Sequence, residues 1–582
     1  MLAIKLQLKQ RIQPVLFLLI LAVASFWVWL LTRIPLDDAY IYFRYAENFA
    51  KGFGPVFNVA EYVEGYSGFS WLILLTLGAC ADLPMNLFAQ SLSICSYFLV
   101  IVILYLYGQK AYPKSARSLL FPLLYTASPA CALWAGFALE TIFYSLLILL
   151  FFMVYLHWNQ LRWQRIFTGM LACAVGLSRP EGIVVYAYLL AFEAVHQLCT
   201  QKKLHWQRLA EYAMGMILFL FFLYSRYSYY GYLLPNTYYV KVSMNENFWH
   251  RGLAYLHEFI STHAGGKLLL GTVFLHGCLF RKASKEWWCL ALFIALFFLI
   301  VIQSGGDWWP FSRHALPIYP LVVILMGNFF ARMFNPAALQ RIWRWIIRSA
   351  ALTLLSITIY TNMNGVLMSS RRFPQSVFTP DYNRAFQTYA KFYGNLLNRI
   401  LEPQQTFALA PIPFVANYYK GYVLDTLGLT DRHIAHRKIA LGGMTHSHEK
   451  GDGSYVLAMR PTLFRFFGHL DIYTKPMQYP KPSDVYFVTD REILANPEFK
   501  ILYEPLAIKV RNLYVMFWKL KKESVKTLPE NEINALYDDT IGKMQHWPQD
   551  DFLETFYRFY NSAENTFAFR VYQKVRAILS GL

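Results

Sequence analysis

The chain has 582 residues, of which 56% are hydrophobic and only 15% are charged, well below the roughly 25% charged residues typical of soluble domains. This composition excludes an ordinary soluble protein. The formal net charge of +19 does not indicate a nucleic-acid partner, because the basic residues before residue 363 lie mostly in short loops between apolar segments, where orientation signals belong. We therefore expect a protein of the lipid bilayer that does not bind nucleic acid.

Apolar segments that could cross the hydrocarbon core recur as far as about residue 360. We expect eleven, at residues 14–33, 86–107, 118–134, 138–157, 166–178, 180–197, 209–228, 267–281, 286–302, 314–331 and 346–362. The first has the charge pattern of a signal peptide but no small-residue cleavage site, so we interpret it as a retained anchor. The segments on either side of Arg179 are short, and either cross separately or form one re-entrant hairpin. The stretch 69–80 is expected to be a partial or interfacial helix.

Basic residues concentrate in alternate loops, which places those loops and the N-terminus on the cytoplasmic side. These loops contain Lys5, Lys9, Arg11, Lys110, Lys114, Arg117, Arg162, Arg165, Lys202, Lys203, Arg208, Arg281, Lys282, Lys285, Arg332, Arg341 and Arg344. An odd number of spans then leaves the C-terminal half outside. The expected organisation is a helical membrane domain at 1–362, whose first periplasmic loop covers 34–85, followed by a periplasmic domain at 363–582.

The C-terminal half has the pattern of a mixed α/β soluble domain. Short apolar strands are expected at 407–410 and 485–488, and helices at 381–397 and 531–544. Such a domain could hold an acceptor glycan over the membrane. The stretch THSHEKGDG contains His446, His448 and Glu449, but their spacing matches no standard zinc site and a solvated loop is the better interpretation. We expect no metal and no other cofactor.

Two adjacent carboxylates, Asp37 and Asp38, lie where the first span meets the segment DDAYIYFRYAENFAKG. This segment is expected to form an amphipathic helix on the membrane surface, with Tyr40, Phe43 and Phe49 as interfacial aromatic residues. Neighbouring carboxylates at a membrane boundary suffer desolvation and mutual repulsion, which favours a functional role over a structural one. A helix N-terminal cap is the alternative.

Further polar side chains occur at the outer ends of later spans. They are Glu140, Arg179, Glu181, Asn236, Tyr238, Lys241, Asp307, Arg313 and His314. Ionisable groups at this depth are costly unless they face a cavity or a partner. Arg179 and Glu181 could instead form a local ion pair, and Lys241 could be a snorkelling loop lysine. Carboxylates combined with cations suit the transfer of a sugar from a lipid-linked phosphate, because cations stabilise the departing phosphate and a carboxylate can act on the acceptor or the sugar.

Six motifs occur in order along the chain: DDAYIYFRYAENFAKG, VEGYSG, LSRPEG, LPNTYYVKV, GGDWWPFSRHALP and LDTLGLTDRHIA. Together they resemble the terminal β-(1→2)-arabinofuranosyltransferases of the cell-wall arabinan pathway, members of the GT-C superfamily, over roughly residues 10–440. The resemblance implies an enzyme of the bacterial inner membrane. Its donor would be a polyprenyl-phosphate sugar, which in the founding family is decaprenyl-phosphoryl-β-D-arabinofuranose, and its acceptor would be a cell-envelope glycan or glycolipid.

The resemblance also implies residue roles. Asp37 and Asp38 become the catalytic pair, with Asp37 slightly favoured and one of the two acting either as a base or directly on the anomeric carbon. The donor phosphate would be bound by Lys241, Arg179, Arg313 and His314. Sugar and acceptor would contact Arg44, Glu64, Tyr66, Glu140, Glu181, Asn236, Tyr238, Asp307 and Trp308. Tyr66, Trp308 and Trp309 could stack on sugar rings, although aromatic residues also collect at membrane interfaces.

Two other functions fit a polytopic protein with buried charges. A transporter or flippase for lipid-linked sugars would show a two-fold repeat in its hydropathy pattern, and this sequence shows none. A non-catalytic envelope scaffold could share the same fold, but it would not need the intact Asp37 and Asp38. Glycosyl transfer is therefore the favoured interpretation.

Overall fold

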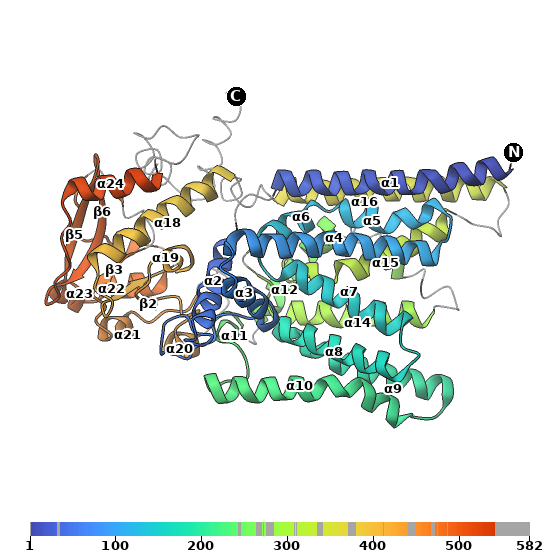
Figure 1. The fold of residues 1–582 in the computed structure, drawn as a ribbon, viewed down its shortest axis with the longest axis horizontal. Helices are drawn as coiled ribbons and strands as arrows, with labels where there is room; N and C mark the ends of the chain where they lie inside the picture. The colour runs from blue at the N-terminus through green and yellow to red at the C-terminus, as the bar shows by residue number, and fades with distance from the viewer. Residues whose placement is uncertain are drawn as a thin grey trace.

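A computed structural model gives the arrangement of the chain (Figure 1). It describes residues 2–31, 35–242, 246–263, 270–271, 273–274, 277, 284–307, 309, 311–334, 341–369, 380–410, 412–439, 449–466, 472–473, 475–485 and 487–541. Long helices run side by side through most of the molecule, and a smaller domain with a sheet lies at one end of them. This arrangement confirms the predicted fold class, a helical membrane domain followed by a mixed α/β domain.

The helical domain is built from apolar helices joined by short loops. Its elements are α1 (Leu2–Leu31), α2 (Asp37–Ala50), α3 (Phe69–Cys80), α4 (Met85–Ala111), η1 (Ala116–Leu119), α5 (Leu120–Thr126), α6 (Pro129–Gly136), α7 (Thr141–His157), α8 (Arg162–Ser178), η2 (Pro180–Gly182), α9 (Ile183–Gln201), α10 (Trp206–Tyr230), α11 (Asn236–Lys241), α12 (Glu246–His263), α14 (Lys285–Gln303), η3 (Leu316–Ile318), α15 (Tyr319–Met333) and α16 (Arg341–Ser369).

Six helices in the described part of the chain are long and apolar enough to cross a bilayer, and each matches a predicted span. They are Ile12–Leu31, Met85–Ala111, Pro180–Gln201, Trp206–Tyr230, Lys285–Gln303 and Leu316–Met333. A seventh is formed if Ala116–Thr126 and Pro129–Gly136, which meet at 54°, count as one span. The chain is thus a membrane protein with several spanning helices.

The remaining predicted spans fare differently. The segment 138–157 forms α7, a shorter apolar helix, and 69–80 forms the short helix α3, as expected. The segment 166–178 lies in α8, whose first turn contains Arg162, Gln164 and Arg165 and is too polar for the hydrocarbon core. The segment 346–362 is helical within α16 but falls outside the set of long apolar helices. Most of 267–281 lies outside the described residues.

Close packing of α8 against α10 fixes the end of α8 that carries Arg179. A Cβ on Gly169 would lie 2.2 Å from the carbonyl oxygen of Tyr212, and a Cβ on Gly215 would lie 2.1 Å from the carbonyl oxygen of Gly169. Only glycine lets two helix backbones approach so closely, as is common between membrane helices. The approach holds α8 in position, and the chain leaves it at Arg179 in an extended conformation.

The C-terminal domain contains one six-stranded sheet with helices packed on it. Its elements are α18 (Pro380–Ile400), β1 (Thr406–Leu409), α19 (Pro413–Tyr418), β2 (Tyr422–Asp425), α20 (Arg432–His436), α21 (Gly453–Ala458), β3 (Leu463–Phe464), β4 (Ile472–Tyr473), η4 (Pro482–Asp484), α22 (Val488–Ala495), α23 (Pro497–Leu502), β5 (Tyr503–Val510), β6 (Leu513–Leu520) and α24 (Glu530–Ile541). Strands β2, β1 and β3 are parallel neighbours, while β3, β4 and β5 pair antiparallel with β6.

The predicted strand at 407–410 and the predicted helices at 381–397 and 531–544 correspond to β1, α18 and α24. The predicted strand at 485–488 was wrong, because Val488 instead begins the helix α22. There the hydroxyl of Thr489 bonds to the carbonyl of Thr426, so this apolar stretch serves as a helix entry and does not join the sheet.

The segment 37–50 is helical as expected, but it is not an interfacial helix. Tyr40 and Phe43 of α2 are buried at 0% and 1% exposure, packed among other side chains of the protein and away from the lipid surface. The amphipathic pattern arose because one face of α2 packs into the protein core. Helices α2, α3 and α11 lie between the long helices and the C-terminal domain (Figure 1).

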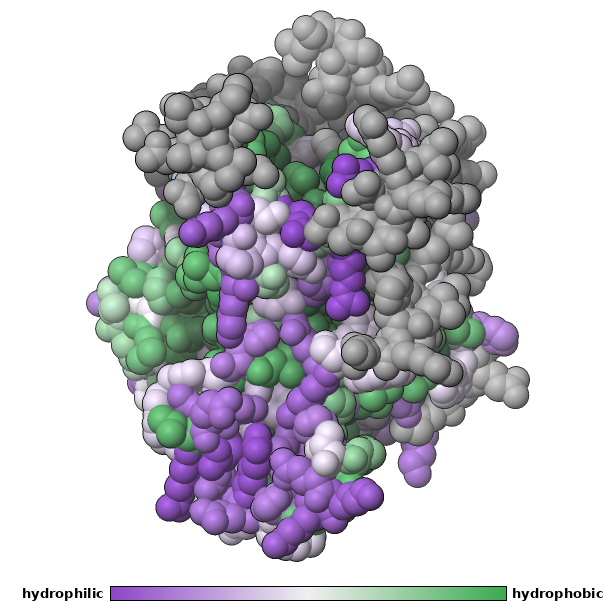
Figure 2. Space-filling view, turned by 90° about the vertical axis from the view of Figure 1, so that its right-hand side faces the viewer, coloured by the Kyte–Doolittle hydropathy of each residue, from purple (hydrophilic) through white to green (hydrophobic). Residues whose placement is uncertain are grey.

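The opposite end of the helical domain presents a hydrophilic surface. Figure 2 views this end, and hydrophilic side chains gather in its lower part, where α8 and α10 begin and α9 ends. Exposed residues there include Arg162, Lys202, Lys203 and His205. This is the surface that the basic loops of the sequence predict.

Candidate functional site

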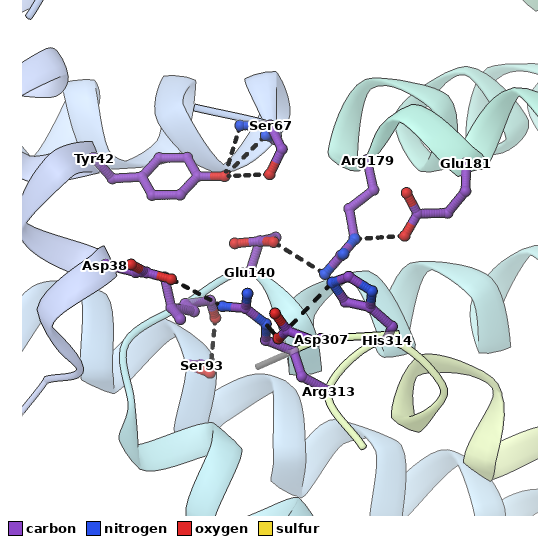
Figure 3. A network of polar contacts seen from close by, with 12 residues as sticks. Asp38, Tyr42, Ser67, Ser93, Glu140, Arg179, Glu181, Asp307, Arg313 and His314 are labelled. Carbon is purple, nitrogen blue, oxygen red and sulfur yellow. Dashed lines mark hydrogen bonds and ion pairs between the residues drawn. The ribbon is translucent and has the colours of Figure 1, made fainter. Parts of the chain in front are cut away.

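A cavity of about 370 Å³ lies where the helical domain meets the C-terminal domain. Its charged lining was predicted from the sequence and comes from five separate segments of the chain. These lining residues are Asp38, Glu140, Arg179, Glu181, Lys241, Arg313 and His314. Figure 3 shows most of them facing one another. Folding has therefore gathered the ionisable groups that the sequence scatters over nearly 280 residues.

Asp38 enters the cavity from the first turn of α2. Its Oδ2 lies 3.2 Å from Nη1 of Arg313, and its side chain is 22% exposed. Asp37 is not among the cavity-lining residues that the structure describes; its Oδ1 accepts the backbone N–H of Asp38 at 2.8 Å. Carboxylates in a first helical turn are favoured by the helix dipole. The predicted capping role is not observed, because Leu36 occupies the cap position.

The two aspartates differ in what surrounds them. Burial and the neighbouring charge of Asp38 together raise the pKa of Asp37 to about 7, against the opposing effects of the Asp38 backbone N–H, Arg313 and Lys241. Asp37 therefore changes its charge near neutral pH, whereas Asp38 is held by a direct ion pair. Of the predicted pair, Asp38 is the carboxylate that a ligand in the cavity would meet.

Arg313 links two carboxylates from distant segments. Its Nε lies 2.6 Å from Oδ2 of Asp307, and its Nη1 contacts Asp38. Burial by itself would lower the pKa of Arg313, but Asp307 and Asp38 raise it above its ordinary value. The guanidinium is therefore firmly charged and acts as a bridge, and Asp307 lies behind it with only 2% of its side chain exposed.

His314 is a neutral group in this site. Its Nε2 lies 3.9 Å from Oδ2 of Asp307, too far for a hydrogen bond. Burial lowers the pKa of His314 well below its usual range; Asp307 opposes this effect, and the nearby cations Arg179, Arg313 and Lys241 add to it. The predicted role of His314 as a cation for phosphate is thus revised: at neutral pH it can donate or accept a hydrogen bond but adds no charge.

Arg179 is held by two carboxylates on the facing wall (Figure 3). Its Nε lies 2.6 Å from Oε1 of Glu181, and its Nη1 lies 3.3 Å from Oε1 of Glu140. Burial opposes the charged form, but Glu181 and Glu140 together raise the pKa of Arg179 above its ordinary value. The local pair with Glu181 therefore exists, and Glu140 extends it across the cavity.

Lys241 is the exception among the cations of the lining. It ends α11, whose residues Thr237 and Tyr238 also line the cavity. Within the described part of the chain it forms no ion pair with a carboxylate. A cation without a carboxylate partner beside a cavity is the natural contact for an anionic group.

One wall of the cavity is apolar and belongs to a spanning helix. Phe297, Ile300 and Val301 of α14 line it. Charged groups on one side and a membrane helix on the other suit a ligand with a polar head and a lipid tail.

The C-terminal domain closes the cavity through the loop after β2. Leu429 in this loop lines the cavity. The side-chain amide of Asn236 donates to the carbonyl oxygens of Gly428, Leu429 and Asp431 at 2.8, 3.1 and 3.1 Å. Asn236 thus positions the loop and is not among the described residues that line the cavity; its contact with the sugar stays a prediction.

Gly65 explains why the first-loop motif needs a small residue at this junction. A Cβ on Gly65 would lie 2.6 Å from Cγ2 of Thr430 and 3.1 Å from the carbonyl oxygen of Leu429. The backbone of the first loop at Gly65 therefore packs directly against the loop after β2. The motifs VEGYSG and LDTLGLTD meet at the cavity although more than 350 residues separate them in the sequence.

Two predicted sugar contacts face elsewhere. Arg44, with 9% exposure, donates five hydrogen bonds that join α2 and its loop to the C-terminal domain; the acceptors are the carbonyls of Phe57, Ala416, Tyr419 and Gly421 and the side chain of Asn58. Glu64 forms a buried ion pair with Nε of Arg226 at 3.0 Å. Both side chains hold the structure together, and neither is among the described residues that line the cavity.

The aromatic predictions divide similarly. Tyr66 and Tyr238 line the cavity, but Tyr66 is 2% exposed and its hydroxyl lies 3.1 Å from that of Tyr230. Trp308 lies outside the described residues, and Trp309 packs partly buried against the hydrophobic core. Tyr238 is the predicted aromatic residue best placed to contact a ligand.

Sequence reasoning missed Tyr42, Ser67 and Leu429, which also line the cavity. The hydroxyl of Tyr42 accepts the N–H of Gly68 at 2.9 Å and lies 3.4 Å from Oγ of Ser67. Tyr42 lies one helical turn after Asp38 on the same face of α2, so the helical period was a usable signal. Nothing in the sequence places Leu429 there.

Fold and site together define a polytopic membrane protein with a charged cavity under a mixed α/β domain. No family model matches the chain. A terminal β-(1→2)-arabinofuranosyltransferase of Mycobacterium tuberculosis is 29% identical over 248 residues, which cover 39% of this chain and 38% of that protein. The chain therefore matches well under half of the length of this relative. The match confirms the resemblance drawn from the motifs.

Solved structures of two membrane proteins also superpose on the chain. ArnT from Cupriavidus metallidurans, bound to undecaprenyl phosphate, is 13% identical and matches with a TM-score of 0.47 over 71% of this chain and 85% of that one. The Archaeoglobus fulgidus oligosaccharyltransferase in the apo form is 11% identical, with a TM-score of 0.46 over 70% of this chain and 64% of that one. Superpositions below a TM-score of 0.5 do not by themselves establish a shared fold.

Proposed function

We propose that this protein is a membrane glycosyltransferase of the GT-C type, which moves a sugar from a polyprenyl-phosphate donor to a glycan or glycolipid of the cell envelope. The observation that carries the proposal is the cavity itself: Asp38, the bridged Arg313 and Lys241, which has no carboxylate partner among the described residues, share one space with the apolar wall of α14. The similarity to an arabinofuranosyltransferase supports the same reaction class. An arabinofuranose-like sugar is the finer form of the proposal.

In this reaction the bond between the anomeric carbon and the phosphate oxygen breaks, and polyprenyl phosphate leaves with the bonding electrons. Lys241 stabilises the negative charge that the departing phosphate gains. The acceptor hydroxyl forms the new bond to the anomeric carbon, and its proton passes to the carboxylate of Asp38. Arg313 holds that carboxylate in place at 3.2 Å. If the linkage retains its configuration, the carboxylate of Asp38 instead attacks the anomeric carbon first and expels polyprenyl phosphate. The acceptor hydroxyl then displaces Asp38, and its proton passes to the released phosphate.

The remaining groups of the cavity have supporting roles. Arg179, fixed by Glu140 and Glu181, forms a rigid wall, and His314 offers a neutral hydrogen-bonding group. The lipid tail of the donor would lie along Phe297, Ile300 and Val301. The proposed reaction lies on the face of the membrane that carries the C-terminal domain. The basic loops at the opposite end support the proposal that this face is the periplasmic side of the inner membrane.

The proposal is tested by transfer of radiolabelled sugar from polyprenyl-phosphate-linked arabinofuranose to membranes that lack the gene. Asp38→Asn should lower the rate by about 10²–10⁴-fold, the usual contribution of a catalytic base, while the protein still inserts. Asp82→Asn is the matched control, because Asp82 is exposed in the loop after α3. Wild-type rates in Asp38→Asn would refute the catalytic assignment. An unchanged glycan profile after deletion of the gene would favour a transporter or a scaffold.

A further inference from the structure

A second hollow lies directly beside the cavity, between α11 and the C-terminal domain. Its volume is about 570 Å³, and it is lined by Tyr238, Tyr239, Val242, Ala435, His436, Arg437, Lys438, Ile439 and Lys450. Tyr238 and Val242 belong to the lining of both spaces. Helices α11 and α20 pack against each other at this point. We call this hollow the α11–α20 groove; a molecule lying in it would reach the cavity past Tyr238.

The charged residues that line the groove are all basic. Arg437 is balanced by Asp452 and Glu492, at 3.6 and 3.5 Å. Lys438 is exposed, and Lys450 is 8% exposed and donates to the carbonyl of Ala435 at 2.6 Å. In the described part of the chain neither lysine forms an ion pair with a carboxylate. The groove therefore has uncompensated positive charge.

The residues that follow Ile439 in the sequence carry no balancing charge. Residues 440–448 read ALGGMTHSH and contain no carboxylate. The positive charges also affect His436, which lines the groove: burial lowers the pKa of its imidazole, and the charges of Lys450 and Arg432 lower this pKa further. A buried positive charge that no carboxylate balances is costly unless a ligand neutralises it, and within the described residues Lys450 has a carbonyl partner but no carboxylate.

Aromatic rings flank these cations. The ring of His436 stacks on that of Tyr232, with centroids 4.1 Å apart, and lies tilted against that of Tyr239, with centroids 4.2 Å apart. Flat ring faces beside hydrogen-bonding groups suit contact with a sugar ring, while the cations suit an anionic substituent. The groove belongs to the C-terminal domain and to α11, and its charged lining comes from the C-terminal domain. This favours a glycan over a phospholipid head group.

We propose that the α11–α20 groove binds an anionic glycan, carrying carboxylate or phosphate groups, as the acceptor of the transfer reaction. The role of this glycan as the acceptor rests on the proposed function, whereas the binding site itself is argued only from the geometry and charge of the groove. An anionic acceptor would lie with its charges on Lys438 and Lys450 and its terminal hydroxyl beyond Tyr238, in the cavity. Lys241, on the cavity side of Tyr238, remains for the phosphate of the donor.

The test is a binding measurement on the full-length protein in neutral nanodiscs, with hexagalacturonate and its fully methyl-esterified form as probes. The acid form should bind at least about tenfold more tightly at low salt, and the preference should shrink at higher salt because the contact is ionic. Lys438→Glu should weaken binding of the acid at least about fivefold. Lys475→Glu, an exposed charge reversal elsewhere in the same domain, should not. Displacement by mannose 6-phosphate or by monomeric galacturonate distinguishes a phosphate from a carboxylate preference.

Three results would overturn the inference: equal binding of the acid and the ester, equal losses in Lys438→Glu and Lys475→Glu, or binding that disappears in nanodiscs with anionic phospholipid and so identifies a lipid head-group site. Asp38→Asn separates this outcome from the catalytic proposal. That variant should bind hexagalacturonate as the wild type does, whether or not it transfers sugar. Binding without transfer in the wild type would leave the groove intact and remove the proposed reaction.

Discussion

Two buried charge clusters occupy opposite ends of the helical domain. At the end remote from the C-terminal domain, Glu193 is 1% exposed and both of its carboxylate oxygens have two donors. Oε1 faces Arg208 and Gln197, and Oε2 faces Tyr155 and Lys285, at 2.7 to 3.3 Å. At the other end, the cavity brings Asp38 and Arg313 together with Lys241, a cation without a carboxylate partner in the described residues.

The difference shows that buried charge alone does not identify a site. The Glu193 cluster joins α9, α10 and α14 and satisfies its own carboxylate, as structural ion pairs do. The cavity cluster encloses about 370 Å³ and includes Lys241, a cation without a carboxylate partner in the described residues. A charged ligand can bind only where charged groups line a cavity. We therefore expect variants of the cavity cluster to impair the reaction and variants of the Glu193 cluster to lower stability.

The largest contrast is expected between the lysines of the two clusters. Lys241→Met should raise the KM for the lipid-linked donor by roughly 10–100-fold, because a charge-assisted hydrogen bond is worth about 1.5–3 kcal/mol. Lys285→Met, in the Glu193 cluster, should leave that KM unchanged. Initial rates at varied donor concentration measure both. Equal changes in KM would show that the lysines act through the structure and not on the donor.

A smaller effect, on stability, is expected from Glu193→Gln. The change leaves Arg208 and Lys285 close together without a carboxylate, and because both are about 30% exposed water offsets part of the cost, leaving about 1–2 kcal/mol. The midpoint of thermal unfolding in detergent should fall by several degrees while kcat stays within about twofold. A variant that kept its stability but lost transfer would place a second functional site at this end.

The smallest effect concerns Asp37 and appears only as a pH dependence. With a pKa of about 7, Asp37 is neutral below this pH and gains a negative charge above it. The donor phosphate then meets one more negative charge near the cavity, so the donor KM should rise a few-fold between pH 6 and 8.5. Asp37→Asn should keep the low KM throughout this range. A mutant whose KM still rose with pH would assign the titration to another group.

Much of the site could be predicted from the sequence because membrane spans restrict where charges can be. Asp38, Arg179, Lys241 and Arg313 each stood at a span end, where an unpartnered charge is costly, and all four line the cavity. Arg44, in the first loop, was predicted to contact the sugar or the acceptor, but it is not among the described residues that line the cavity. The local sequence indicates that the charge of Arg44 needs a partner. It does not indicate which one, because the partners include backbone carbonyls more than 370 residues away in the chain.

The sequence by itself determined the apolar helices, the mixed C-terminal domain and the charged residues that gather at one end, since hydropathy and periodicity are local properties. Only the tertiary structure decided which carboxylate faces the cavity, which cations are already neutralised, and that Leu429 from the C-terminal domain completes the wall. Those facts depend on distances between segments that are remote in the chain. They are set by packing, such as the contact of Gly65 with Thr430, which no local pattern encodes.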